Sequence, residues 1–295
     1  MVVAATGFFD GVHKGHRKVL GTLCEIARRE GKKSAVVTFW PHPRSVLQQG
    51  ADNLRLLNSL EEKKELIRQS GVDEFFVLPF SREFSKLSSR EFVAEYLRDK
   101  FAVSTLIIGY DHRMGHSSSE TQEDFIKMAA EERVKVVRVS EFIEGDLTVS
   151  STKIRNYLVS GELAKANDFL GYNYSLKGVV VSGKKLGRKI GFPTANLALY
   201  EPLKVIPGGG VYGVKVELLG KVYKGVCNIG TRPTVNATEE RTIETHILDF
   251  NEDIYGLDMR VEFFFKIRDE VKFASLEELA SQIKNDKRRV KETDF

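Results

Sequence analysis

The sequence predicts two domains of different classes. The first half reads as an α/β domain with a parallel sheet, and the second half as a small antiparallel β-barrel with a terminal helix. Three observations predict this division: β-rich runs alternate with helical patterns in the first half, glycine-separated alternating runs replace them from Tyr172, and 295 residues suit two domains. We place the first domain at residues 1–171 and the second at 172–295.

Each expected strand of the first half is a short β-rich run, and helical patterns lie between the strands. Such alternation predicts parallel strands joined by right-handed crossovers, and ligands of such sheets bind at the carboxyl ends of the strands. The expected strands are residues 2–5, 34–39, 74–78, 105–108 and 134–139, and the expected helices are residues 17–29, 60–69, 89–100, 121–132 and one that begins at Thr152.

The second half consists of short alternating runs, which are typical of antiparallel strands and most consistent with a small barrel. A helix is expected from Ser275 to Lys284, because Ser275 suits an N-cap and Glu278 stands three residues later. We interpret the charged tail, 284–295, as the end of that helix and a solvated terminus. The expected strands are residues 176–182, 210–218, 221–229, 241–248 and 259–267.

Composition excludes several classes of protein. With 42% hydrophobic and 29% charged residues, the chain can fill ordinary cores and is not disordered. A net charge of +4 is too small to indicate nucleic-acid binding, although it suits anionic substrates. Two distant cysteines give no disulfide framework, and no apolar run or signal peptide indicates a membrane or secreted protein. We expect a cytoplasmic protein with small-molecule substrates and neither nucleic-acid nor membrane partners; self-association stays open.

The most informative segment is the histidine loop, Gly7–His16 (GFFDGVHKGH), between the first strand and the first helix. Glycines let backbone N–H groups approach an anion, and a helix N-terminus adds partial positive charge. His13 and His16 are three residues apart, so both can face that anion. The pattern His-x-Gly-His in this context resembles the signature of nucleotidyltransferases, which move a nucleotide from a triphosphate to a phosphate acceptor.

Two other interpretations of the histidine pair stay open. In the simplest interpretation, the histidines are solvated polar residues or cap a helix. A metal pair is the other, and it is less well supported because no third His, Cys or carboxylate stands nearby at a suitable spacing.

Two further loops follow strand ends in the first half. In residues 38–43 (TFWPHP), the prolines keep the loop stiff and extended, and the aromatic pair can stack on a planar ring; the alternative is a rigid loop with a core tryptophan. In residues 109–115 (GYDHRMG), Asp111 is suited to bind a ring or a ribose, and Arg113 is suited to bind a phosphate. The alternative is a turn that an Asx hydrogen bond holds.

Residues 149–155 (VSSTKIR) predict a second anion contact. First-turn N–H groups and hydroxyls at a helix start form an anion cradle. Arg155 lies three residues after Thr152, on the same helix face, and can bind phosphate oxygens. The alternative is a plain N-cap with a surface arginine. With the histidine loop upstream, we favour phosphate binding by Ser151, Thr152 and Arg155.

Nucleotidyl transfer at these motifs needs no protein nucleophile. A phosphate on the acceptor attacks the α-phosphorus of ATP and pyrophosphate leaves, so the enzyme aligns two anions and neutralises developing charge. We expect the two histidines to donate hydrogen bonds to the phosphoryl oxygens, and the 149–155 segment to hold the pyrophosphate. Mg²⁺ is expected as well, because it screens the triphosphate.

In the second half, residues 183–196 (GKKLGRKIGFPTAN) combine three regularly spaced glycines with four basic residues. The segment lacks the Gly-Lys-Ser/Thr ending of a Walker loop, but a flexible backbone and cations again suit an anion. Thr194 and Asn196 are two residues apart, so their oxygens point to the same side of an extended segment and suit Mg²⁺. The alternative is a basic hairpin followed by a type I turn.

Glu244 lies in an expected strand and shares one face with His246 and Leu248. A glutamate directed into a barrel mouth can take a proton from an attacking hydroxyl. The alternative is an exposed strand residue without a catalytic role.

These motifs, in this order, resemble the bacterial bifunctional riboflavin kinase/FAD synthetase family. The likeness spans nearly the whole chain, and it also rests on residues 228–235, 244–250, 255–256 and 268–270. The resemblance implies a Rossmann-like nucleotidyltransferase domain that adenylylates FMN to FAD and releases pyrophosphate. It also implies an antiparallel split β-barrel that phosphorylates the 5′-hydroxyl of riboflavin with ATP.

The resemblance implies roles residue by residue. His13 and His16 would be catalytic in adenylylation, and Glu244 would be the base of phosphorylation. Thr194 and Asn196 would hold Mg²⁺ and ATP. The implied nucleotide- or phosphate-binding residues are Gly7, Phe8, Asp10, Gly15, Ser151, Thr152, Arg155, Gly183, Lys184, Gly187, Arg188, Thr194 and Asn196. The implied flavin- or substrate-binding residues are Phe39, Pro41, Pro43, Asp111, Arg113 and Arg268.

The chain departs from the family pattern at His112 and Met114, where aromatic residues are common, and at Arg17, where glutamine is frequent. Three rival functions stay open: a flavin-binding module without turnover, an adenylyltransferase for another phosphorylated metabolite, and a kinase with an inactive first domain. A flavin-binding module would need neither a catalytic base nor metal ligands, which weighs against the first rival. An adenylyltransferase for another metabolite would leave the second half of the chain without a role, which weighs against the second.

Overall fold

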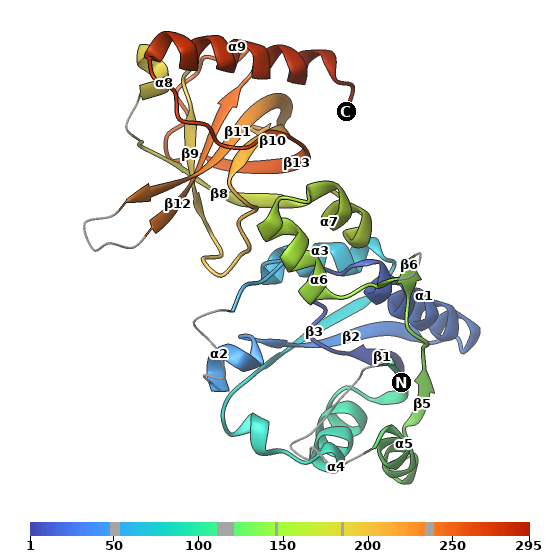
Figure 1. Cartoon of the computed structure of the whole chain (residues 1–295). Coiled ribbons are helices and arrows are strands. Elements are labelled where there is room, and N and C mark those ends of the chain that lie inside the picture. The colour runs from blue at the N-terminus through green and yellow to red at the C-terminus, as the bar shows by residue number, and fades with distance from the viewer. Residues whose placement is uncertain (48–53, 111–120, 145–146, 184–185, 234–238) are drawn as a thin grey trace. The chain divides into compact units, whose positions relative to one another are not determined.

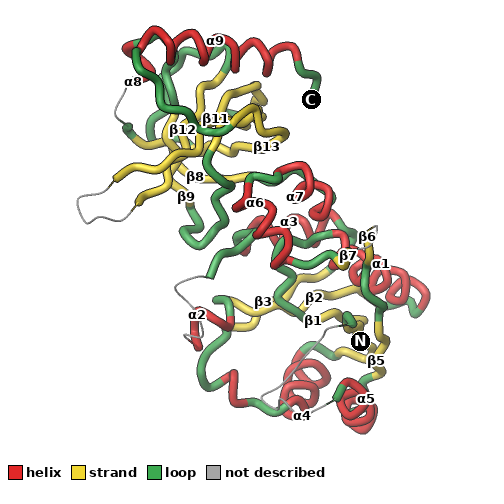
Figure 2. Tube along the Cα trace, in the orientation of Figure 1, coloured by secondary structure: helices red, strands yellow, loops and turns green. Residues whose placement is uncertain are grey.

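The computed structural model, drawn in Figures 1 and 2, describes residues 1–47, 54–110, 121–144, 147–183, 186–233 and 239–295. Contacts divide the chain into two units, Met1–Ser151 and Thr152–Phe295. None of the helices in the described ranges has both the length and the apolar character that a membrane span requires.

In the described part of the N-terminal unit, parallel strands form a five-stranded sheet in the order β3-β2-β1-β4-β5. This order confirms the parallel α/β class, because every neighbouring pair needs a crossover. A short antiparallel pair, β6 and β7, follows the sheet. The bounds are β1 Val2–Thr6, β2 Lys33–Trp40, β3 Glu74–Pro79, β4 Val103–Ile108, β5 Lys135–Arg138, β6 Ile143–Glu144 and β7 Leu147–Thr148.

Helices cover both faces of this sheet, since alternate residues of the buried strands point to opposite sides. Val3 of β1 packs with Leu23 of α1 and Ile67 of α3 on one face. Ala4 lies in the cluster on the other face, with Phe92 and Phe125. The helical segments are α1 Lys14–Arg29, α2 Pro43–Leu47, α3 Leu60–Gln69, η2 Phe84–Lys86, α4 Ser89–Glu91 with its π-helical continuation η3 Phe92–Lys100, and α5 Gln122–Glu131.

The loop after β2 differs from the expectation at its second proline. The Trp40–Pro41 peptide is cis, and Pro43 is the first residue of α2, so the extended conformation does not run through Pro43. Proline is well suited to the first position of a helix, where its missing N–H would have no intrahelical partner.

The strands of the C-terminal unit close into an antiparallel barrel in the order β10-β11-β12-β9-β8-β13. This order confirms the predicted barrel. Strand β9 was expected only as an extended segment, and helix α7 was not expected. The bounds are α6 Ser151–Ser160, α7 Leu163–Leu170, β8 Ser175–Val181, α8 Leu186–Lys189, β9 Ala195–Leu199, β10 Gly210–Leu218, β11 Lys221–Pro233, β12 Glu239–Ile247, β13 Asp258–Arg268 and α9 Leu276–Glu292.

The terminal helix α9 packs against β11 of the barrel (Figure 1). Ser275 is its N-cap and accepts a hydrogen bond from the N–H of Glu278, as expected. The helix continues through the charged segment to Glu292, so this segment is the end of the helix as expected, but the expectation of a solvated terminus is wrong. Val290 is fully buried, and the ring of Phe295 packs against that of Phe265. An amphipathic helix can carry many charges and still bury one face, and the charge count of the tail concealed that face.

Two candidate active sites

The histidine loop holds its two imidazole rings against each other at the start of α1. His13 is the N-cap of α1, and its Nδ1 accepts a hydrogen bond of 3.3 Å from the N–H of His16. The two rings stack with centroids 3.7 Å apart. Because Nδ1 of His13 accepts, the proton of a neutral His13 ring lies on Nε2. The loop therefore offers a ring N–H beside a helix N-terminus.

The His16 ring is kept neutral by its surroundings. Burial lowers the pKa of His16 well below its ordinary value of 6.5, and the charges of His13 and Lys63 lower it further. Its Nδ1 atom is buried and has no hydrogen-bond partner among the described residues. A neutral ring with an unpaired nitrogen is suited to a hydrogen bond with a ligand.

The backbone of the histidine loop needs its glycine between the two histidines. A Cβ atom at Gly15 would lie 3.1 Å from Cε1 of the His13 ring, which is tighter than most such contacts. Gly7 donates a backbone hydrogen bond of 3.2 Å to the carbonyl of Val37 and so joins the loop to β2. Gly15 thus leaves room for the stacked rings, and Gly7 fixes the start of the loop.

Asp10 points to a neighbouring turn. Its Oδ1 accepts hydrogen bonds from the N–H groups of Leu57, at 2.9 Å, and Asn58, at 3.4 Å. Its backbone carbonyl accepts a hydrogen bond of 2.8 Å from Oγ of Ser151, the first residue of α6. Asp10 therefore ties together three segments: the histidine loop, the turn before α3 and the start of α6.

Aromatic side chains line the same region. The Phe8 ring makes an edge contact with His42, with centroids 4.2 Å apart, and lies parallel to Trp40 at 6.2 Å. Phe39 instead packs with Phe84 and Phe92 in the core on the other face of the sheet. Phe8 and Trp40, rather than Phe39, are thus the aromatic groups beside the histidine loop.

Four of the predicted residues lie outside the described part of the N-terminal unit, so their placement beside the histidine loop stays a prediction. Thr152 and Arg155 belong to the C-terminal unit, where Nη1 of Arg155 donates to Oγ1 of Thr152 at 3.5 Å. Asp111 and Arg113, with the departures His112 and Met114, lie outside the described residues.

The barrel groups the predicted kinase residues on adjacent strands. Glu244 of β12 stands opposite Asn228 of β11 on one side and Asn196 of β9 on the other. Oγ1 of Thr194 donates a hydrogen bond of 3.4 Å to Oε2 of Glu244. His246 donates from Nδ1 to the carbonyl of Pro193 at 2.9 Å and so holds the backbone just before Thr194. A carboxylate, a hydroxyl and amide groups therefore converge at this part of the barrel.

Two glycines of the 183–196 segment permit close approaches. A Cβ atom at Gly183 would lie 2.3 Å from Nδ2 of Asn196, and one at Gly187 would lie 2.2 Å from the carbonyl oxygen of Phe192. No side chain fits at either place without displacing its neighbour. Lys184 lies outside the described residues.

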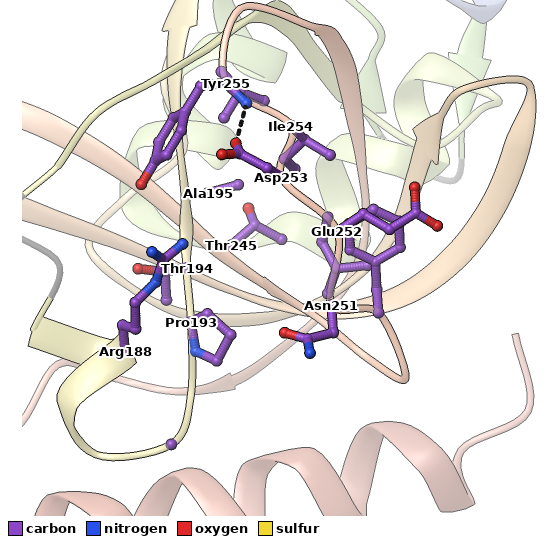
Figure 3. Close-up of a pocket in the computed structure, with 14 residues that line it drawn as sticks. Arg188, Pro193, Thr194, Ala195, Thr245, Asn251, Glu252, Asp253, Ile254 and Tyr255 are labelled. Carbon is purple, nitrogen blue, oxygen red and sulfur yellow. Dashed lines mark hydrogen bonds between the residues drawn. The ribbon is translucent and has the colours of Figure 1, made fainter.

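A pocket of about 580 Å³ opens beside Thr194 (Figure 3). Thr245 of β12 lines it, whereas Glu244 does not, because successive strand residues point to opposite faces. The sequence reasoning missed the loop after β12 as a wall of this pocket; its polar run Asn-Glu-Asp was the available signal. The lining residues are Val180, Arg188, Gly191, Pro193, Thr194, Ala195, Thr245, Ile247, Phe250, Asn251, Glu252, Asp253, Ile254 and Tyr255.

Arg268 forms a buried ion pair with the terminal helix. Its Nη2 donates to Oδ2 of Asp286 at 2.8 Å, and its Nε donates to the same atom at 3.0 Å. Asp286 is only 2% exposed. The guanidinium thus anchors α9 to the end of β13, and substrate binding by Arg268 stays a prediction.

Comparison with known proteins gives two family models on this chain. The FAD synthetase model matches residues 1–153, and the riboflavin kinase model matches residues 170–293. A crystal structure from Streptococcus pneumoniae, of a protein described as a macrolide-efflux protein, is 32% identical. It aligns with a TM-score of 0.90 over 99% of this chain and 94% of the other.

Curated relatives cover nearly the whole chain. A Bacillus subtilis (strain 168) protein is 39% identical over 290 residues, covering 97% of this chain and 90% of the relative. An Escherichia coli (strain K12) protein is 38% identical over 294 residues, covering 98% and 92%. Both are named bifunctional riboflavin kinase/FMN adenylyltransferase. These findings confirm the predicted family and the prediction of a two-function transferase: the chain belongs to the bifunctional riboflavin kinase/FMN adenylyltransferase family, with a FAD synthetase domain followed by a riboflavin kinase domain.

Proposed function

We propose that the chain phosphorylates riboflavin to FMN and then adenylylates FMN to FAD, with one ATP consumed in each reaction. The proposal rests on the family and on one structural observation. Stacked histidines at a helix N-terminus and a glutamate hydrogen-bonded to a threonine occur on units of different fold, so each reaction has its own group of side chains.

In the phosphorylation, the 5′-hydroxyl of riboflavin attacks the γ-phosphorus of ATP, and ADP leaves. Glu244 takes the hydroxyl proton as the oxygen–phosphorus bond forms. The hydrogen bond from Thr194 occupies Oε2 and orients the carboxylate. Asn228 and Asn196 flank Glu244 on the two neighbouring strands, so their amide groups surround the reacting oxygen with polar atoms.

The residues present fit Mg²⁺. Thr194 and Asn196 supply hard oxygen atoms, and Gly183 leaves space against the Asn196 amide. Within the described ranges, no three His, Cys, Asp or Glu residues group as metal ligands. That agrees with an ion that takes one or two protein ligands and completes its shell with phosphate and water. Thr194 and Asn196 would hold the ion, and bound Mg²⁺ neutralises charge on the ATP phosphates.

The pocket beside Thr194 has the size of a small-molecule site, since such sites span roughly 300–1,000 Å³. We infer that it takes part of one kinase substrate. Arg188 offers a guanidinium for a phosphate at one wall, and Asp253 and Tyr255 offer polar groups at another (Figure 3).

In the adenylylation, a phosphate oxygen of FMN attacks the α-phosphorus of ATP, and pyrophosphate leaves. The Nε2–H of His13 and the neutral ring of His16 donate hydrogen bonds to the α-phosphoryl oxygens, and the α1 N-terminus adds positive potential. Ser151, Thr152 and Arg155 hold the pyrophosphate. The remaining predicted substrate contacts of this reaction are Pro41, Pro43, Asp111 and Arg113. Arg268 is the remaining one in the phosphorylation. We do not propose Phe39 as a contact, because it packs in the core with Phe84 and Phe92.

We also propose that the first functional domain ends at residue 171, although contacts group α6 and α7 with the barrel. Helix α7 ends at Leu170, Gly171 caps it in the left-handed conformation at φ +74°, and the first barrel strand begins at Ser175. The family models leave most of α6 and most of α7 between them. We further propose a cytoplasmic location and no nucleic-acid partner, in keeping with two free cysteines and a net charge of +4.

One product analysis tests the proposed function. The purified chain is incubated with riboflavin, ATP and Mg²⁺, and the products are separated by chromatography over time. FMN that appears first and is then converted to FAD is the expected result. FMN alone would leave a kinase with an inactive first domain, and no product would leave a flavin-binding module.

A further inference from the structure

Lys63 is a buried cation that none of the assigned roles explains. It lies in the first turn of α3, and its side chain is fully buried. Its Nζ atom has no hydrogen-bond partner among the residues that the structure describes. Burying an ammonium group costs free energy unless an anion pairs it, so such a group is rarely left unpaired.

The ammonium group lies against the aromatic side chains of the histidine loop region. Nζ is 3.3 Å from the centroid of the Phe8 ring and 5.6 Å from that of the Trp40 ring. Cation–π contacts with these rings compensate only part of the lost hydration. The rings also place the charge beside the proposed adenylylation site, because Phe8 belongs to the histidine loop.

The position itself is a core position. Lys63 and Ile67 are one helical turn apart and are the buried residues of α3. An apolar side chain at position 63 would satisfy the same packing without an unpaired charge, and such replacements are often stabilising. A lysine that is kept at a cost in stability indicates a role in binding or catalysis.

The charge of Lys63 is coupled to the groups around it. Burial lowers the pKa of Lys63 to about 8, and the nearby charge of Asp10 opposes this shift. In turn, Lys63 lowers the pKa of His16. The Oδ1 atom of Asp10 already accepts from backbone N–H groups. The other titratable groups of the surrounding elements are His13 in the histidine loop and His42 next to Phe8.

We propose that Lys63 is a phosphate-binding residue of the adenylylation: its buried ammonium group, held against the rings of Phe8 and Trp40, is the counter-charge for a substrate phosphate. The inference rests on the proposed function of the histidine loop. Asp10 acts on Lys63 through its charge, but Nζ has no hydrogen-bond partner among the described residues, so a bound phosphate supplies a direct partner and the charge of Lys63 favours the phosphate-bound state. Burial is the main cause of the low pKa of His16, and the charge of Lys63 adds to it.

The test compares three full-length proteins: wild type, Lys63→Met and Lys63→Arg. The initial rate of FAD formation from FMN is measured against pH, and FMN formation from riboflavin by the same preparations is the internal control. Trp40 is the only tryptophan of the chain, so its fluorescence during urea unfolding reports the stability of the N-terminal unit.

Lys63→Met is expected to lower kcat/KM for FAD formation by roughly tenfold or more, the size of one lost charged contact. Riboflavin phosphorylation is expected to be unchanged, and the urea midpoint is expected to stay equal or rise. Burial lowers the pKa of Lys63 to about 8, so wild-type kcat/KM should fall as the pH rises through 8 and the ammonium group loses its proton, and Lys63→Met should lack this alkaline limb. Lys63→Arg stays charged at that pH, so it should also lack the limb while keeping more of the activity.

Wild-type kcat/KM together with a wild-type alkaline limb in Lys63→Met would overturn the proposal. If the wild type itself makes no FAD from FMN, the proposed function fails instead. If Trp40 fluorescence shows that Lys63→Met is unfolded, calorimetry of FMN binding to the wild type at pH 8 tests the proposal instead. Net proton uptake supports the proposal, because the phosphate raises the pKa of Lys63 from about 8; binding without uptake overturns it.

Discussion

At the scale of single residues, the two reactions depend on side chains whose environments differ sharply. Glu244 lies on a barrel strand between two asparagines and accepts a hydrogen bond from Thr194. His16 is enclosed beside a second histidine, and burial depresses its pKa. One site thus holds an oriented carboxylate that can accept a proton, and the other holds a neutral ring that contacts phosphate.

Glu244→Gln tests the role of the carboxylate. The amide keeps the shape of the side chain but cannot take the hydroxyl proton, so FMN formation should fall by roughly 10²–10⁴-fold, the usual size of general-base catalysis. Conversion of added FMN to FAD should be unaffected. Both rates are measured by chromatography, with Glu217→Gln on β10 as an exposed control. Loss of both activities would contradict two independent groups of residues.

His16→Ala tests the histidine loop. Without the ring, the α-phosphoryl oxygens lose a hydrogen-bond donor, and FAD formation should fall by roughly 10²-fold or more, as for other lost donors to a developing charge. Riboflavin phosphorylation by the same preparation serves as the control and should persist. An unchanged rate of FAD formation would remove the histidine loop from the adenylylation.

At the scale of elements, short segments set the geometry of each site. The capping box of α3, formed by Ser59 and Glu62, fixes where that helix begins and hence where Lys63 lies. In the barrel, β9 begins directly after Thr194 and brings Asn196 opposite Glu244. The position of each functional side chain therefore depends on the start of a helix or the register of a strand.

Gly183→Ala tests the close approach to β9. The added Cβ would lie 2.3 Å from Nδ2 of Asn196, so that amide must move away from its place opposite Glu244. We expect the KM of the phosphorylation for MgATP to rise by roughly tenfold, the cost of one misplaced charge-assisted contact. Initial rates at varied MgATP measure it. Gly21→Ala is the matched control, because nothing lies within 4 Å of its Cβ; equal KM values in both variants would contradict the prediction.

Helices and strands with a clear apolar periodicity were predictable from the sequence, and short elements were not. The helix at 60–69 and the strand at 210–218 agree with α3 and β10 at both ends, because their apolar patterns are local. β9 has five residues and pairs with β12 only through Asn196 and Ala195. Its strand conformation depends on partners far away in the sequence, which no local pattern reveals.

At the scale of the whole molecule, each of the two units has its own core and its own candidate site. The C-terminal unit includes Val211, Val226 and Val290 in a cluster between barrel and terminal helix. Separate cores agree with separate reactions, since the two histidines lie in the first unit and Glu244 and Thr194 lie in the second.

Mixing two defective variants tests this independence. Glu244→Gln retains the adenylylation and His16→Ala retains the phosphorylation, so the mixture should convert riboflavin to FAD because FMN diffuses between molecules. Chromatography of the mixture measures FAD, and each variant alone should form much less. Failure of the mixture to form FAD, while each variant keeps its own activity, would show that FMN must remain on one chain.

The sequence by itself determined the order of two unlike domains and the places of the histidine loop, of Thr194 and Asn196, and of Glu244. Glycine spacing, helical period and strand alternation are local properties, so they can be found without a partner. Only the tertiary structure decided that Lys63 is buried against Phe8 and that Thr245, not Glu244, lines the barrel pocket. Burial, ion pairing and the direction of a strand's faces depend on which distant elements pack together, and that information is absent from any single segment of the chain.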